Sequence, residues 1–112
     1  MAEEPTVLVV EEPTASLDFA NQDRVLELIA GLAAEGIAVI FTTHHPDQAF
    51  AVASHVAMLR DGGILAAGET RAVLTGPALT QLYGREVLVR EGEGRTVCFT
   101  GAAIPAAPRP PA

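Results

Sequence analysis

The sequence predicts an α/β fold, in which two parallel strands joined by a crossover helix are followed by a small extension rich in β-hairpins. Two continuous apolar runs of strand length occur at 6–11 and 37–43, and a segment with helical periodicity separates them. Shorter strand-like runs joined by turn signals occupy the second half of the chain. A strand, a helix and a second strand in this order form a parallel, right-handed crossover unit.

The first half contains the crossover unit. The runs "TVLVVE" (6–11) and "IAVIFTT" (37–43) are uninterrupted and aliphatic, which is typical of strands buried on both faces. Asp18 is placed to cap the intervening helix, and Gly36 to close it. Five apolar residues recur there at helical spacing, and we interpret them as core packing: Val25, Leu26, Leu28, Ile29 and Leu32.

The second half reads as short elements. Pro46 opens a helix that is predicted to run to about Ser54, since proline suits a first helical turn. "HVAMLR" and "ILAAGE" are two strands around the Asp-Gly-Gly turn at 61–63. Short helices are expected near 69–75 and 77–83, and then "EVLVRE" and "RTVCFT" as a terminal hairpin. The Ala- and Pro-rich segment 101–112 is expected to be a disordered tail, which leaves 1–100 as one partial domain.

Composition excludes several classes of protein. The 112-residue chain has a formal net charge of −7, and its seven basic residues are all Arg and are scattered along the chain. A nucleic-acid-binding protein would cluster such residues. No apolar run approaches the roughly 18 residues of a membrane span, and the acidic start "MAEEPT" is unlike a signal peptide. The lone Cys98 fits a reducing cytoplasm, and we interpret it as strand packing.

Acidic and imidazole side chains follow the two parallel strands. Glu11 and Glu12 lie at the end of the first strand, and Thr42, Thr43 and His44 at the end of the second. These carboxyl ends share one edge of a sheet, where ligands of α/β proteins bind. Adjacent strand residues point to opposite faces, so the two carboxylates are expected to have separate roles, one in a metal shell and one on a water. The set indicates metal-assisted phosphoryl transfer to water.

Three segments resemble the ATPases of ATP-binding-cassette (ABC) transporters. "VLVVEEPTASLD" (7–18) resembles the Walker B motif and the D-loop that follows it, and "VIFTTHHPDQA" (39–49) resembles the switch-histidine segment. "VAMLRDGGILAAGETRAVL" (56–74) is similar to the strand, turn, strand and helix that come next in that family. The resemblance covers the chain from Ala2 to about Leu82 and implies part of a P-loop NTPase domain.

The resemblance implies roles for particular residues. It implies that Glu12 polarises the attacking water, that His44 contacts the γ-phosphate and that Glu11 belongs to the Mg²⁺ shell. The D-loop residues Ser16, Leu17 and Asp18 are expected to face a second ATPase subunit. The implied cofactors are ATP and Mg²⁺, the implied partners are that second subunit and transmembrane permease subunits, and nucleic acid is not among them. The implied location is cytoplasmic, at the inner face of the cell membrane.

The sequence departs from the family pattern in three ways. Glu11 stands where the family usually has Asp, and His45 stands where Asp is common. The phosphate-binding loop GxxxxGK followed by Ser or Thr is missing from this sequence, which has no Lys, and so is the Leu-Ser-Gly-Gly-Gln-like signature. No cofactor-binding residue can therefore be assigned, and the sequence resembles the C-terminal portion of such an ATPase.

The same residues are also compatible with simpler interpretations. Glu-Glu-Pro alone could be a strand end with solvated acids, but the Leu-Asp and Thr-Thr-His segments in order favour the ATPase interpretation. His44, His45 and His55 could suggest zinc, yet they lack the usual ligand spacing and cysteine partners.

Two functions remain open at this point. In the first, the chain is an ATP-binding subunit, or a truncated fragment of one, of an ABC importer. "LDFANQ", "TTHHPDQAF" and "LYG" are similar to importers of iron–siderophore, haem, cobalamin or oxyanion type. In the second, it is a non-catalytic interaction module, or a pseudogene product, that docks on a partner ATPase. In either case we expect the chain on its own to be inactive.

Overall fold

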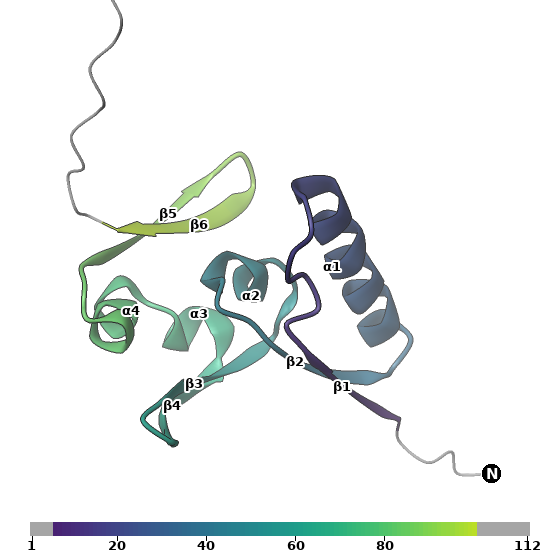
Figure 1. Cartoon of the computed structure of the whole chain (residues 1–112), viewed down its shortest axis with the longest axis horizontal. Coiled ribbons are helices and arrows are strands. Elements are labelled where there is room, and N and C mark those ends of the chain that lie inside the picture. The colour runs from purple at the N-terminus through teal and green to yellow at the C-terminus, as the bar shows by residue number, and fades with distance from the viewer. Residues whose placement is uncertain (1–5, 101–112) are drawn as a thin grey trace, which may run out of the picture.

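The computed structural model describes residues 6–100, and the tail predicted at 101–112 lies outside them. Strands and helices alternate in the first half and short elements follow in the second (Figure 1). In order, the elements are β1 (Val7–Glu11), α1 (Phe19–Ala34), β2 (Ala38–Thr42), α2 (Pro46–Val52), β3 (His55–Arg60), β4 (Gly63–Glu69), α3 (Thr70–Val73), α4 (Gly76–Tyr83), β5 (Val87–Gly92) and β6 (Arg95–Thr100).

The predicted crossover unit is confirmed. β1 and β2 pair in parallel, with a register that runs from Val7 opposite Ala38 to Glu11 opposite Thr42. Asp18 is the N-cap of α1, because its carboxylate accepts a hydrogen bond of 2.8 Å from the backbone amide of Asn21. The unit therefore brings the ends of two parallel strands side by side and starts a capped helix directly after the first of them.

Only some of the five apolar residues predicted to pack in the core from helix α1 are buried. Leu26 and Ile29 are buried, and Val25 and Leu32 are half-buried. The prediction for Leu28 is wrong, since this residue is 62% exposed. Leu28 precedes the buried Ile29 by one position, and successive helical residues point about 100° apart, so both cannot face a narrow contact.

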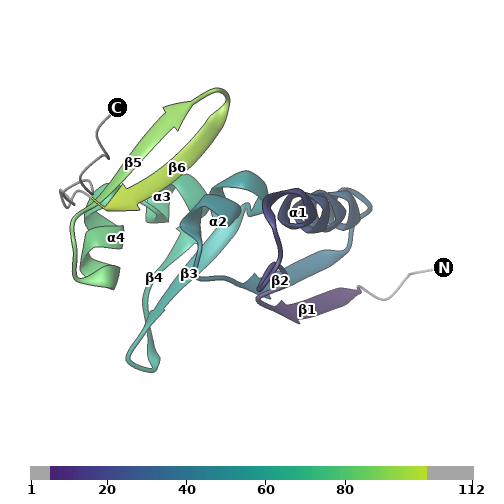
Figure 2. The same cartoon turned by 45° about the horizontal axis from the view of Figure 1, so that its top comes forward.

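The prediction that β1 and β2 are buried on both faces is wrong for this chain. Val7, Val9 and Ile40 are 55%, 68% and 57% exposed. Helix α1 lies over one face of the pair (Figure 2), and no described element covers the other. The apolar runs have the composition of covered strands, but residues 6–100 supply only one of the two covering layers.

The second half folds as two antiparallel hairpins and three helices around its own core. β3 pairs with β4 and β5 with β6, as predicted, and β3–β4 has a bulge between Met58 and Leu59. The first hairpin turns at Asp61 and Gly62, whose φ angles of 51° and 78° are those of a tight two-residue turn. Helix α2 ends at Val52, before the predicted Ser54, and α3 and α4 lie close to their predicted positions.

The core lies between α2, α3, α4 and the two hairpins. Its buried residues are Ala49, Met58, Val73, Leu74, Leu79 and Val87. Among the described residues the sheets are three separate two-stranded pairs, so no strand pairing joins the second half to β1–α1–β2, and helix α1 instead packs against α2. This packing places α2 between the crossover unit and the β5–β6 hairpin (Figure 1). None of the helices in residues 6–100 is long and apolar enough to cross a membrane.

Candidate phosphoryl-transfer site

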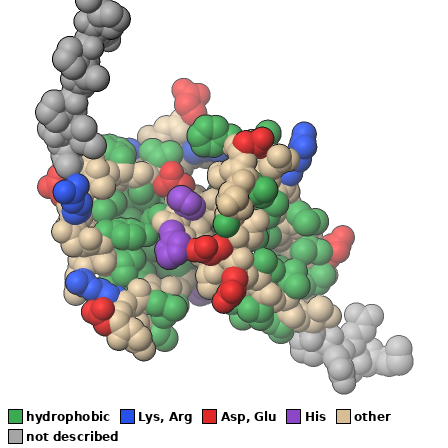
Figure 3. Space-filling view, viewed as in Figure 1, with side chains coloured by type: hydrophobic (Ala, Val, Ile, Leu, Met, Phe, Trp, Pro, Cys, Tyr) green, Lys and Arg blue, Asp and Glu red, His purple; other side chains and the backbone are tan. Residues whose placement is uncertain are grey.

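The carboxyl ends of β1 and β2 form an open pocket. Its volume is about 290 Å³, and its lining consists of Glu11, Glu12, Thr42, Thr43 and His44. The structure thus brings together, at one edge, the acids of the first strand and the imidazole that follows the second. Acidic and histidine side chains meet on the corresponding face of the surface (Figure 3). The pocket is open to solvent, so a ligand would reach these groups without any rearrangement of the chain.

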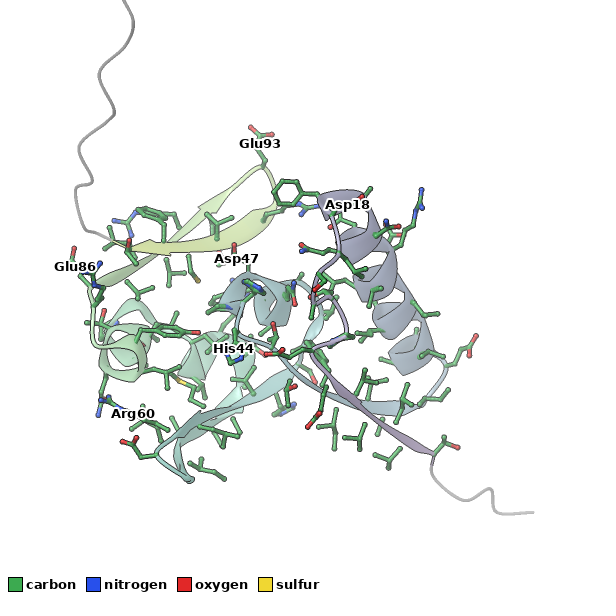
Figure 4. The ribbon with its side chains drawn as sticks, viewed as in Figure 1. Asp18, His44, Asp47, Arg60, Glu86 and Glu93 are labelled. Carbon is green, nitrogen blue, oxygen red and sulfur yellow. The ribbon has the colours of Figure 1, made fainter. Side chains whose placement is uncertain are left out.

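Glu12 and His44 form the closest contact in this pocket. Nε2 of His44 lies 2.5 Å from Oε1 of Glu12, although the two side chains are 84% and 42% exposed. Figure 4 shows His44 at the centre of the molecule, just beyond the end of β2. A carboxylate can accept a proton from a bound water, and an imidazole at hydrogen-bonding distance can hold that carboxylate in place.

The backbone holds Glu12 in an unusual conformation. Its amide donates to the carbonyl oxygen of Thr42 at 3.1 Å and lies 3.0 Å from the Thr42 hydroxyl oxygen. Its φ angle is 41°, in the left-handed region that residues with a side chain seldom adopt. Such a conformation costs on the order of 1–3 kcal/mol and persists where surrounding contacts hold it. The bonds to Thr42 are contacts of this kind.

Glu11 and Glu12 face one pocket, whereas the alternation of a strand predicted opposite faces. The strand ends at Glu11, Glu12 has a left-handed backbone, and both residues contribute to the lining of the pocket. Both carboxylates are therefore available to a single ligand. Strict alternation of side chains applies only within extended backbone, so it does not fix the direction of the Glu12 side chain.

The predicted D-loop residues lie in the turn between β1 and α1. Ser16 is exposed with φ 64°, and Leu17 is half-buried. The turn is closed by backbone hydrogen bonds from Ala15 to Glu12 (3.0 Å) and from Leu17 to Thr14 (3.2 Å). Asp18 is exposed but its carboxylate caps α1 (Figure 4). The turn thus presents Ser16 on the surface, whereas the carboxylate of Asp18 already has a structural role.

Sequence reasoning did not identify two residues that contact the loops of this pocket. Gln48 of α2 is 6% exposed, and its Oε1 accepts hydrogen bonds from the hydroxyls of Thr14 and Thr43. Tyr83, at the end of α4, donates a hydrogen bond of 3.3 Å to the carbonyl oxygen of His44. The available signals were weak. Gln48 lies four residues after the histidine, and Tyr83 is the single tyrosine of the chain.

The residues present fit a divalent cation only in part. In residues 6–100 no group of three or more His, Cys, Asp or Glu side chains is placed to hold a metal ion. Mg²⁺ is commonly held by one or two carboxylates together with substrate phosphates, and Glu11 and Glu12 can supply that part. The chain contains no Lys, and the five pocket residues include no glycine-rich phosphate cradle.

Solved structures confirm the fold class. The structure described as "An inward-facing conformation of a putative metal-chelate type ABC transporter" matches with a TM-score of 0.75 and 34% identity, over 84% of this chain and 39% of that chain. The structure of cbiO1 from Clostridium perfringens, part of the ABC transporter complex cbiONQ, matches with a TM-score of 0.58 and 27% identity, over 69% of this chain and 31% of that chain. The fold is therefore that of part of an ABC ATPase, a P-loop NTPase.

Sequence relatives agree with this class. The cobalt import ATP-binding protein CbiO of Rhodobacter capsulatus is 44% identical over 75 residues, which are 67% of this chain and 27% of the relative. The molybdate import ATP-binding protein MolC of Haemophilus influenzae is 37% identical over 101 residues, 89% of this chain and 40% of the relative. The hemin import ATP-binding protein HmuV of Nocardia farcinica is 42% identical over 89 residues, 80% of this chain and 31% of the relative.

A family model described as "AAA domain, putative AbiEii toxin, Type IV TA system" matches residues 1–47. That segment holds β1, α1, the whole of β2 and the start of α2. The relatives and the solved structures together confirm the resemblance stated above: the chain is homologous to ATP-binding subunits of ABC importers. It spans between 27% and 40% of the length of the curated relatives cited here.

Proposed function

We propose that this chain is the water-activating and dimer-facing part of an ATP-binding subunit that energises an ABC importer. The observation that carries the proposal is the 2.5 Å contact between Glu12 and His44 at the carboxyl ends of two parallel strands. Carboxyl ends of this kind are where ligands bind in α/β proteins. The ATP-binding names of the relatives support a nucleotide as the ligand.

In this proposal Glu12 is the general base. Its Oε1 orients a water and takes its proton as that water attacks the terminal phosphate. His44 contacts the transferred phosphoryl group and keeps the Glu12 carboxylate in place through their close contact. Glu11 would supply a carboxylate to the Mg²⁺ shell, and the cation would neutralise charge that develops on the phosphate oxygens. Phosphate binding itself requires a loop that residues 1–112 lack, because the sequence has no Lys.

The partners and the location follow from the same assignment. Ser16, Leu17 and Asp18 face a second ATPase subunit, and permease subunits couple hydrolysis to transport at the cytoplasmic face of the membrane. The relatives are named for cobalt, molybdate and hemin import, and one solved structure for a metal-chelate type transporter. A metal ion, an oxyanion or a metal chelate is therefore the class of cargo we propose.

A chimera tests the catalytic assignment. In it, residues 1–100 of this chain replace the matching part of the molybdate subunit of H. influenzae, which then supplies the phosphate-binding loop. Replacing a general base should slow turnover by about 10²–10⁴-fold. We expect this for Glu12→Gln, with little change for Glu27→Gln, an exposed acid on α1. A Glu12→Gln chimera that hydrolyses ATP at the unsubstituted rate would refute the role of Glu12.

The second candidate is a non-catalytic interaction module that docks on a partner ATPase. The exposed apolar face of β1 and β2 favours it, since such a face is available for docking. If this candidate is correct, the chimera hydrolyses no ATP, whereas the 112-residue chain binds an intact ATPase subunit in calorimetry. Encoded sequence upstream of Met1 that contains a lysine-bearing phosphate-binding loop would favour the catalytic candidate instead.

A further inference from the structure

A single buried oxygen connects the two loops that carry the candidate catalytic pair. Oε1 of Gln48 accepts hydrogen bonds from the hydroxyl of Thr14 at 3.0 Å and from the hydroxyl of Thr43 at 2.9 Å. Gln48 and Thr14 are 6% and 4% exposed, so water does not replace these bonds readily. Thr14 lies in the turn after β1, whereas Thr43 lies directly after β2, so the oxygen bridges segments that are distant in sequence.

Each threonine is close to one member of the pair. Thr14 is two residues after Glu12, and its carbonyl oxygen accepts the backbone bond from Leu17 that closes the turn. Thr43 directly precedes His44, and its hydroxyl oxygen also accepts a 3.0 Å bond from the amide of His45. The Thr43 hydroxyl therefore donates to Gln48 and accepts from His45 at the same time. A chain of hydrogen bonds thus runs from the helix to both sides of the site.

We propose that Gln48 is a positioning residue, which sets the distance between Glu12 and His44 by holding Thr14 and Thr43 on one acceptor oxygen. The proposal rests on the proposed function for the catalytic role of Glu12 and His44. The hydrogen-bond network itself is present without nucleotide. Gln48 touches neither substrate nor metal in this scheme and acts through the two loops alone.

The chemistry of the network selects the residue type. Two hydroxyl donors converge on one oxygen, which a carbonyl or a carboxylate can satisfy with its two lone pairs. Glutamate keeps such an oxygen at the same distance from the backbone, whereas leucine fills similar space and accepts nothing. Leucine would leave two hydroxyls without their acceptor, and a buried donor without a partner must find one by moving. The loops move with those hydroxyls.

Amide hydrogen exchange of the 112-residue chain, followed by NMR, tests this without ATP. The reporters are the amides of Glu12 and His45, which bond to Thr42 and Thr43 respectively. Relative to the unsubstituted chain, we expect Gln48→Leu to lower the protection of both amides by about tenfold, the factor that corresponds to 1.4 kcal/mol. Gln48→Glu should restore protection to within about twofold, since it keeps the acceptor oxygen.

Thr70→Val is the matched control. The Thr70 hydroxyl is buried and donates a 2.7 Å hydrogen bond to the carbonyl oxygen of Ala53, away from the pocket. Removing this hydrogen bond lowers the stability of the chain but leaves the bonds of Gln48 in place. The protection of the two reporter amides should therefore fall no more than that of amides elsewhere in the chain. If Gln48→Leu prevents folding, Thr14→Val is the alternative, because it removes only one of the two donors. It should lower the protection of the Glu12 amide from exchange more than that of the His45 amide.

Two results would overturn the proposal. One is a folded Gln48→Leu chain whose Glu12 and His45 amides keep their protection. The other is a Gln48→Glu chain that loses protection as Gln48→Leu does, because acceptance by the oxygen would then not be the reason. Failure of the chimera to hydrolyse ATP would refute the proposed function and leave this exchange pattern unchanged, so the two failures are distinguishable.

Discussion

Asp47 and Cys98 join the first turn of α2 to the last strand. Oδ1 of Asp47 accepts a 2.8 Å hydrogen bond from the backbone amide of Cys98 (Figure 4 shows Asp47 between α2 and β6). Partial burial, the charge of the nearby Asp47 carboxylate and a side-chain hydrogen bond with it together raise the pKa of the Cys98 thiol to about 12. The contact that docks the terminal hairpin therefore also keeps the thiol protonated, in agreement with its interpretation as packing.

Cys98 should consequently react slowly and make stability depend on alkaline pH. The folded pKa lies above the unfolded value of 9.0, so the stability from the half-buried thiol is complete below pH 9 and is lost as pH rises towards 12. We expect alkylation by iodoacetamide at pH 9 to be at least about tenfold slower in the native chain than in urea.

Asp47→Asn separates the two causes of this pKa shift. Asparagine keeps an acceptor for the Cys98 amide and removes the charge, so native alkylation should become faster while remaining slower than in urea, because burial persists. Equal alkylation rates in the native chain and in urea would show that the thiol is not shielded.

The 112-residue chain should neither bind ATP with useful affinity nor hydrolyse it. The pocket offers Glu11, Glu12 and His44 but no lysine and no phosphate cradle, and water activation is ineffective unless the reacting phosphate is held. Calorimetric titration with MgATP should therefore give no heat of binding at micromolar concentrations. Micromolar, Mg²⁺-dependent binding would contradict this prediction.

Glu11→Asp should raise the turnover of the chimera. The family usually carries Asp here. Mg²⁺ tolerates little distortion of its ligand geometry, and the extra methylene of Glu11 moves its carboxylate away from the position that an Asp carboxylate would take. We expect a rise of a fewfold in steady-state ATP hydrolysis, with Glu11→Gln lower than either acid. Equal rates for Glu and Asp would mean that the open pocket accommodates the longer side chain.

The chain should self-associate through the β1–β2 pair. Both outer edges of this two-stranded sheet are unpaired among the described residues, and Val9 is 68% exposed on an aliphatic strand. Exposed edges and apolar faces promote association. Light scattering should report particles larger than a monomer, and Val9→Lys should reduce them. Phe19→Ser, at an 88% exposed position on α1, is the matched control and should change little.

A different result would contradict that prediction. A monomer in which the amides of both strands resist hydrogen exchange would show that β1 and β2 are protected in solution. It would also favour the interaction-module candidate, because the 112-residue chain would then be stable by itself.

The order and type of the elements could be predicted because each depends on local chemistry. Aliphatic runs, the Asp18 cap and the turn at Asp61 and Gly62 act within a few residues, and their positions agree with the structure to within about two residues. Burial could not be predicted in the same way. The exposure of Val9 and Ile40 depends on which elements cover the two faces of their strands. The apolar sequence of a strand indicates that both faces suit covering layers, but not whether residues 6–100 supply those layers.

The candidate site could be predicted only as far as its motif residues. The proximity of Glu12 and His44 follows from parallel pairing, which brings the ends of β1 and β2 together. The left-handed φ of Glu12 depends on tertiary contacts with Thr42 that no periodicity encodes. Gln48 was missed because a polar residue on a helix is usually solvated, and its burial becomes evident only when α2 is packed.

The three separate sheets have a consequence for how the chain unfolds. No backbone ladder passes from one pair of strands to another within residues 6–100, so opening one pair breaks no hydrogen bond of its neighbours. Cooperativity depends on side-chain contacts alone, and these are dense around Leu79 and sparse over β1 and β2. The crossover unit should therefore melt first in urea, and probes in β1 and in α4 should report different midpoints.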